Sequence, residues 1–198
     1  MATPPDFTAG QVLTAAQMNA VGLWKITPTS VSGTGASIDA NGDVVVSSGG
    51  ANLTVNGVFS TDYKNYRILV SDFKASGASS IQLSMGTSAT GTSHKWAAVF
   101  VSSAGVVNGT GSAGAAFFDC PIITRSTTDS AGGEIVLFSP FESIETSVVC
   151  SGSDSDNGSI MRQMSGRLIN NTSYTACFFT LLGAVTFTSV RVSFYGFN

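Results

Sequence analysis

Charge is scarce in this sequence, and its scarcity excludes several classes of protein. Only 11% of the residues are charged, against about 25% in an average soluble protein. Nine Lys and Arg against twelve Asp and Glu give a net charge of −3. A helical bundle needs charged outer helix faces and a nucleic-acid-binding protein needs a basic stripe, so neither class fits. Ser and Thr supply the polar surface instead, because they make up about a quarter of the chain.

Cysteine and histidine are also rare, which limits the metal and redox chemistry. The three cysteines, Cys120, Cys150 and Cys177, are widely separated and form no CxxC motif. This pattern favours free, buried thiols, with one disulfide as the alternative. The single histidine, His94, cannot form the clusters of common zinc and two-His iron sites. We therefore expect neither a metal centre nor a cofactor.

Long hydrophobic runs are missing as well. The apolar segments 97–101 and 178–185 are short and interrupted, whereas a membrane helix needs roughly 18 consecutive residues. The residues that follow Met1 lack the basic region and the apolar core of a secretory signal. We therefore expect no membrane insertion, and synthesis and folding in a reducing cytosol.

A short helix is predicted near the N-terminus, over residues 15–21. Thr14 and Gln17 have the spacing of a capping box, and Leu13 and Met18 occupy the two positions of a hydrophobic staple. A helix of about two turns is marginal in water on its own. It must therefore dock, either on its own domain or on another subunit or partner protein.

Residues 1–26 are interpreted as an attachment segment and residues 27–198 as a separate β-domain. The apolar side chains of the segment form a block of their own at one terminus, which favours docking on a partner. The predicted partner-attachment residues are Phe7, Val12, Leu13, Met18, Leu23 and Trp24.

The remaining sequence predicts an all-β domain. Residues 81–85 and 190–194 alternate between apolar and polar side chains, as half-buried strands do. Asn41-Gly42 and Asn56-Gly57 predict type I′ hairpin turns. The predicted fold is an antiparallel β-sandwich of jelly-roll type, preceded by one short N-terminal helix. Its clearest strands are predicted at 52–59, 66–73, 80–85, 95–101, 117–124, 134–141, 146–151, 159–168, 174–182 and 187–197.

Several local patterns suggest chemistry, but each has a simpler interpretation. The glycines of 109–114 match a dinucleotide fingerprint, yet Pro121 leaves no room for the required helix, which predicts a glycine loop. Asp154 and Asp156 lack the later ligands of an EF-hand, which favours a solvated turn over an irregular cation site. His94 is assigned to the surface or a strand end, because no nucleophile motif accompanies it. Since the carboxylates are scattered rather than paired, no enzyme activity is expected.

Three segments resemble a known family. Residues 7–19, Phe-Thr-Ala-Gly-Gln-Val-Leu-Thr-Ala-Ala-Gln-Met-Asn, followed by Gly22-Leu23-Trp24, resemble a segment often seen at the start of tailed-bacteriophage fibre and minor tail proteins. Residues 59–72 look like the opening strand of the β-sandwich in such proteins, and residues 190–197 are similar to their last strand. Long fibres carry a shaft or repeats between anchor and head. This chain has almost none, so the resemblance points to a short fibre or knob.

The resemblance implies a virion structural protein made in the host cytoplasm. It would be a homotrimeric tail-fibre or tail-tip subunit that docks through residues 1–26 on another phage tail or capsid protein. Its sandwich would be displayed outward, with binding of a host surface glycan or protein as a further option. One alternative is a capsid decoration or head-fibre protein. Another is a lectin-like carbohydrate-binding module, for which Trp96 and Tyr195 are the candidate sugar-platform aromatics.

Overall fold

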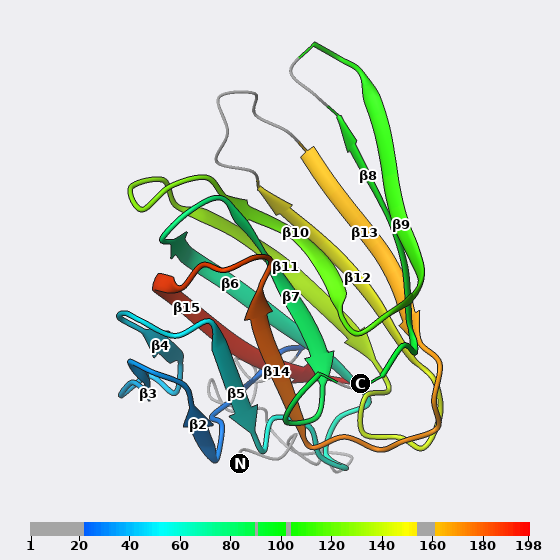
Figure 1. Cartoon of the computed structure of the whole chain (residues 1–198). Coiled ribbons are helices and arrows are strands. Elements are labelled where there is room, and N and C mark those ends of the chain that lie inside the picture. Colours follow the sequence, from blue (N-terminus) through cyan, green and yellow to red (C-terminus); the bar gives the residue numbers. More distant parts are fainter. Residues whose placement is uncertain (1–21, 90, 102–103, 154–160) are drawn as a thin grey trace.

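The protein is all-β in the part that the computed structural model describes, which is residues 22–89, 91–101, 104–153 and 161–198 (Figure 1). Every strand pair is antiparallel. The prediction of an antiparallel all-β fold is therefore confirmed. The helix predicted over 15–21 lies outside the described residues, as do Phe7, Val12, Leu13 and Met18.

The larger sheet contains ten strands among these residues. Its longest strands alternate over most of their length: in β6, Tyr66, Ile68 and Val70 are buried whereas Leu69 and Ser71 are exposed. One face of the sheet is therefore apolar along most of its width. The strand order is β3 (Ala36–Ile38), β4 (Val44–Val46), β15 (Phe187–Phe197), β6 (Asn65–Ala75), β11 (Ala131–Phe138), β12 (Thr146–Ser153), β13 (Met161–Leu168), β8 (His94–Val101) and β9 (Val107–Ala115), and β1 (Trp24–Ile26) pairs with the end of β15.

The smaller sheet lies across the apolar face of the larger one, which gives a sandwich-like arrangement (Figure 1). The core fills the space between the sheets with fully buried side chains such as Leu83 and Phe118 from the smaller sheet and Ile135 from the larger. The order in the smaller sheet is β10 (Phe118–Thr124), β7 (Ser79–Met85), β14 (Ala176–Leu181), β5 (Asn52–Asn56) and β2 (Ser30–Ser32).

Strand β10 packs unusually close to β11 and β12, because two glycines remove side chains from the contact. A Cβ added at Gly133 or at Gly152 would lie 2.7 Å from Cγ1 of Ile122, and one at Gly152 would also overlap the Pro121 carbonyl oxygen. Real Cβ atoms do not approach other atoms this closely. These two positions therefore admit only glycine at the observed separation of the sheets.

Residues 109–114 form part of strand β9 and not the glycine loop that was predicted. A Cβ at Gly111 would lie 2.7 Å from the carbonyl oxygen of Trp96 on β8, so the glycine allows close strand pairing. The prediction was wrong because β9 is an exposed edge strand. Such a strand buries no face, and it therefore shows no alternation of apolar and polar residues.

The two Asn-Gly turns differ from the prediction. Asn41-Gly42 does connect the paired strands β3 and β4, but only Gly42 has a positive φ, 78°, so the turn is not type I′. Asn56-Gly57 forms no hairpin: β5 pairs with β14 and β2, and the chain continues into β6 of the other sheet. Gly57 has a φ of 69°, which fits a tight bend at this crossing.

The glycine contact between the sheets leads to a prediction about stability. Gly152→Ala should lower the free energy of unfolding by about 1–3 kcal/mol, because the added methyl group overpacks the contact with β10. The matched control is Gly109→Ala on the open edge strand, where the nearest atom to the new Cβ is 3.6 Å away. Chemical denaturation of both variants checks this, and equal stabilities would contradict it.

Candidate attachment site

The described part of the attachment segment begins at one end of the larger sheet. Strand β1 pairs with the last residues of β15, which places Trp24 opposite Gly196. The Trp24 ring stacks on Tyr63 with 5.8 Å between ring centroids and 24° between ring planes. A side chain at position 196 would overlap the Tyr63 ring, so this packing requires glycine there. Trp24 is thus held against the sandwich.

Tyr66 supports the aromatic side chains around Trp24. Its ring meets Tyr63 and Phe59 edge to face, with centroid distances of 6.1 Å and 4.8 Å. Its hydroxyl donates to the Ser60 carbonyl oxygen at 2.8 Å and accepts the Ser60 N–H at 2.8 Å. Because Tyr66 is fully buried and hydrogen-bonded, this end of the sandwich gives a well-packed base for the preceding segment.

Leu23, the other described member of the predicted docking set, lies at the surface. It is 41% exposed and lines a shallow cavity of about 240 Å³ together with Arg67 and Phe197. The neighbouring Trp24 Nε1 is buried and has no hydrogen-bond partner within the described part of the chain. A buried donor of this kind is costly to leave unpaired. An exposed leucine beside it makes this end a suitable place for another segment to dock.

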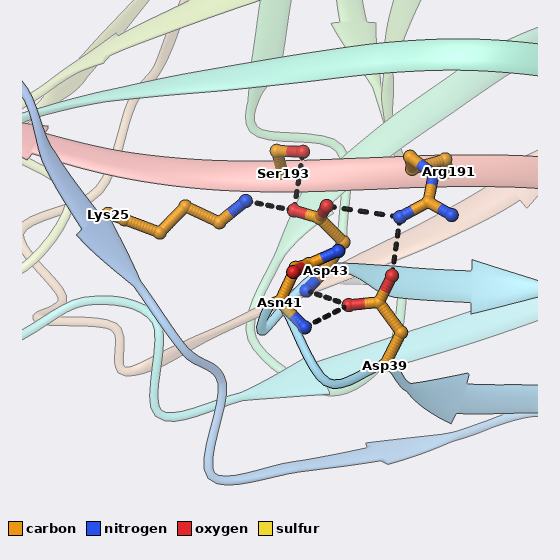
Figure 2. A network of polar contacts seen from close by, with 6 residues as sticks. All are labelled: Lys25, Asp39, Asn41, Asp43, Arg191 and Ser193. Atoms are coloured by element: carbon orange, nitrogen blue, oxygen red, sulfur yellow. Dashed lines mark hydrogen bonds and ion pairs between the residues drawn. The ribbon is translucent and has the colours of Figure 1, made fainter.

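A network of polar side chains fastens β1 and the β3–β4 hairpin to β15 (Figure 2). Asp43 forms an ion pair with Lys25 of β1 and accepts a hydrogen bond of 2.6 Å from Ser193 of β15. Arg191 of β15 donates to Asp39 at 2.5 Å and to Asp43 at 3.1 Å. Two cations thus neutralise two carboxylates, which leaves the carboxylates no excess charge with which to attract a metal ion.

Asp39 also shapes the turn between β3 and β4. Its Oδ1 accepts the backbone N–H groups of Asn41 at 2.9 Å and of Asp43 at 3.0 Å. The hydrogen bond from Arg191, and then those from the backbone, hold the pKa of Asp39 below its ordinary value. Burial alone would raise the pKa of Asp43, but the bonds from its lysine and serine partners outweigh burial and lower it.

Sequence analysis did not single out this network. The Asp-x-Asn spacing of an Asx turn could have identified Asp39. Nothing local could have paired it with Arg191, which lies 152 positions away and reaches it only through the alignment of β15 with β4.

The opposite end of the sandwich carries the β6–β7, β8–β9 and β10–β11 connections. Gly196 pairs with Tyr66, and Tyr66 with Leu137, so that Trp24 lies where β6 begins and β11 ends. The three connections lie beyond the other ends of these strands. In Figure 1 the β8–β9 hairpin reaches the top of the view, while the C-terminus lies at the lower end of the same sheet. Val107 in this hairpin is 66% exposed.

His94 begins β8 but is fully buried, which corrects the predicted surface placement. Its Nδ1 lies 3.2 Å from the Ala115 carbonyl oxygen, and its ring meets Phe118 edge to face at 4.7 Å. Burial lowers the pKa of His94 and so favours the neutral ring. No solvent reaches this imidazole in the observed conformation, and a substrate could not reach it either.

The other candidate residues do not converge on a common site. Tyr195 faces outward beneath the Lys25 ammonium group, 5.2 Å from its ring centroid, whereas Trp96 packs against the core. They therefore do not form one sugar-binding platform. Asp154 and Asp156 lie outside the described residues. Across the described ranges, no three His, Cys, Asp or Glu side chains are grouped to hold a metal ion.

Comparison of the chain with protein-family models, with curated proteins and with solved structures found no match in any of the three. The described strands and connections also include no helix of the length and apolarity that crossing a membrane requires. Two observations therefore bear most directly on function: the geometry of the two ends of the sandwich, and the resemblance of residues 7–24 to phage fibre proteins.

The network around Asp43 predicts a pH-dependent contribution to stability. At pH 7, Asp43→Asn should lower the free energy of unfolding by about 1–3 kcal/mol, because charge-assisted hydrogen bonds are lost. The pKa of Asp43 in the folded protein lies below its ordinary value of 3.8. The wild-type advantage should therefore be complete above about pH 4 and disappear as the pH falls further.

Denaturation of wild type and variant between pH 7 and pH 2 measures this difference. Glu142→Gln is the matched control, because the Glu142 carboxylate forms no ion pair or side-chain hydrogen bond with the described residues. A stability difference for Asp43→Asn that persists unchanged at pH 2 would show that the carboxylate charge is not its source.

Proposed function

We propose that this chain is a structural component of a tailed-bacteriophage virion, most specifically a tail-fibre or tail-tip subunit. The predicted attachment segment, residues 1–26, docks on another virion protein through the part that precedes β1, and the sandwich is displayed away from that protein. The observation that carries the proposal is the placement of Trp24. This last aromatic residue of the phage-like segment is packed at one end of the sandwich, and the β8–β9 and β10–β11 connections occupy the other end.

The geometry around Trp24 supports an attachment role for residues 1–21. Strand β1 and the Lys25–Asp43 ion pair fix the point where this segment leaves the sheet. Leu23 is 41% exposed beside it and offers an apolar contact to a partner. Because β1 is part of the larger sheet, docking of the preceding residues would hold the whole sandwich in a fixed position. The predicted short helix over 15–21, and a jelly-roll connectivity of the strands, belong to the same proposal.

The outer face of the larger sheet supports assembly into a homotrimer. Over β12, β13 and β8 this face presents Ser147, Val149, Ser165 and Ala97, which line a shallow cavity of about 650 Å³. The cations Lys95 and Arg167 line the same cavity, so close packing between copies here needs an acidic group from the neighbouring copy. Closed cyclic symmetry is the usual outcome for homo-oligomers. In this proposal the chain acts by binding and display, without catalysis, cofactor, nucleic acid or membrane insertion.

Removal of residues 1–21 tests the proposal. The truncated protein keeps Trp24 and β1, so it should fold with a melting temperature within a few degrees of the wild type. It should no longer join phage particles. The double substitution Leu13→Asp and Met18→Asp should act in the same way, because burying unpaired carboxylates in the docked segment is costly. Immunoblots of purified particles measure the incorporated chain.

Leu182→Asp is the matched control for the two aspartate substitutions. Leu182 is apolar, like Leu13 and Met18. It is 51% exposed and lies after β14, at the end of the sandwich opposite Trp24. Particles should incorporate this variant normally. If the truncated chain folds and is incorporated as well as the wild type, residues 1–21 are not the attachment segment.

A further inference from the structure

Cys120 and Cys150 face each other across the interior of the sandwich. Cys120 lies on β10 of the smaller sheet, and Cys150 lies on β12 of the larger one. Two residues further along both strands, Ile122 packs directly over Gly152. Side chains two residues apart on a strand point to the same face. Strand β10 shifts its register against β7 between Cys120 and Ile123, but Cys120 and Ile122 are both fully buried and so both face the larger sheet. The alignment of β10 with β12 therefore brings the two cysteines together.

Burial of both thiols agrees with this alignment. The nearby Cys150 thiol and burial raise the pKa of Cys120 well above its ordinary value, and the Cys120 Sγ lies 3.9 Å from the Phe118 carbonyl oxygen. The side chains of Cys120 and Cys150 are 0% and 1% exposed. Both thiols are free in this structure, as the sequence favoured.

The two strands approach each other more closely than the strands of stacked sheets usually do. Stacked sheets usually lie about 10 Å apart, and a disulfide needs Cα atoms about 4.4–6.8 Å apart. Cα atoms of β10 and β12 come within 8 Å of each other. The glycines at positions 133 and 152 make this approach possible, since any side chain there would push β10 away.

Cys177 has a different environment. It lies on β14 of the smaller sheet, where its cross-strand neighbours are Val55 and Met85. It is fully buried as well, and burial raises the pKa of its thiol. No cysteine stands opposite it, so Cys177 serves as an internal reference thiol.

We propose that Cys120 and Cys150 are a site of disulfide formation that links the two sheets when the chain folds in the presence of a disulfide oxidant. One thiolate attacks glutathione disulfide and releases one glutathione, which forms a mixed disulfide. The second thiol then attacks the protein sulfur and releases the second glutathione. Both protein S–H bonds and the S–S bond of glutathione disulfide break, and one protein S–S bond forms. Glutathione disulfide takes up the two electrons and the two protons and becomes two molecules of reduced glutathione.

The link would tie an edge strand of the smaller sheet to a central strand of the larger sheet. In the unfolded chain it would close a loop between positions 120 and 150, which reduces the conformational freedom that folding has to overcome. Oxidation should therefore raise the melting temperature by about 5–15 °C, with a fold that is otherwise unchanged. Because both thiols are buried, the bond should form during folding and resist reduction afterwards.

Refolding of the full chain with glutathione disulfide, beside a parallel sample with reduced glutathione, tests this proposal. The oxidised product should be about 2 Da lighter, since two hydrogens are lost. Proteolysis without reduction should release one linked peptide pair that contains Cys120 and Cys150. Iodoacetamide in denaturant should alkylate only Cys177 in the oxidised product and all three thiols in the reduced one.

Three variants serve as controls. Cys177→Ser should still form the link, whereas Cys120→Ser and Cys150→Ser should each leave no intramolecular disulfide. The peptide map identifies the linked cysteines in the wild-type chain itself. The test therefore remains valid even if one of the variants fails to fold. Three free thiols after oxidative refolding, a bond that includes Cys177, or a linked protein that melts below the reduced one would each overturn the proposal.

Discussion

The pairing of β15 with β6 on one side, and with β4 and β1 on the other, connects parts of the chain that are far apart in sequence. These contacts form only after long loops have closed, which costs conformational entropy and makes such topologies slow to fold. The side chains of Arg191 and Ser193 strengthen the joint by holding Asp39 and Asp43. Trp24 is paired with the same strand, so β15 also fixes the position of β1.

The longer strands that bury one face could be predicted from the sequence, and the exposed edge strand β9 could not. The alternation in 81–85 and 190–194 marks real strands, because packing against the other sheet selects an apolar side chain at every second position. Strand β9 was missed because its glycines face solvent. The type I′ hairpin predicted at Asn56-Gly57 was wrong, because turn chemistry carries no information about which sheet receives the next strand.

At the candidate attachment site, local sequence patterns likewise selected residues but could not predict their contacts. Leu23 and Trp24 were selected as apolar residues next to a predicted helix, and the structure adds that one is exposed while the other is packed on Tyr63. The facing of Cys120 and Cys150 depends on how two sheets stack, which no spacing in the sequence expresses. The proposed attachment, the proposed display and the proposed cross-link all depend on a sandwich that keeps its two ends apart and its sheets close together.

A cryo-electron microscopy reconstruction of the source phage particle is the most direct test of the central claim. It should show three copies of the chain around a three-fold axis at the tail. The end with Trp24 and Gly196 should lie against a neighbouring virion protein, and the β8–β9 hairpin should point outward. A particle without the chain, or one in which the β8–β9 end forms the contact and the Trp24 end faces solvent, would contradict the account.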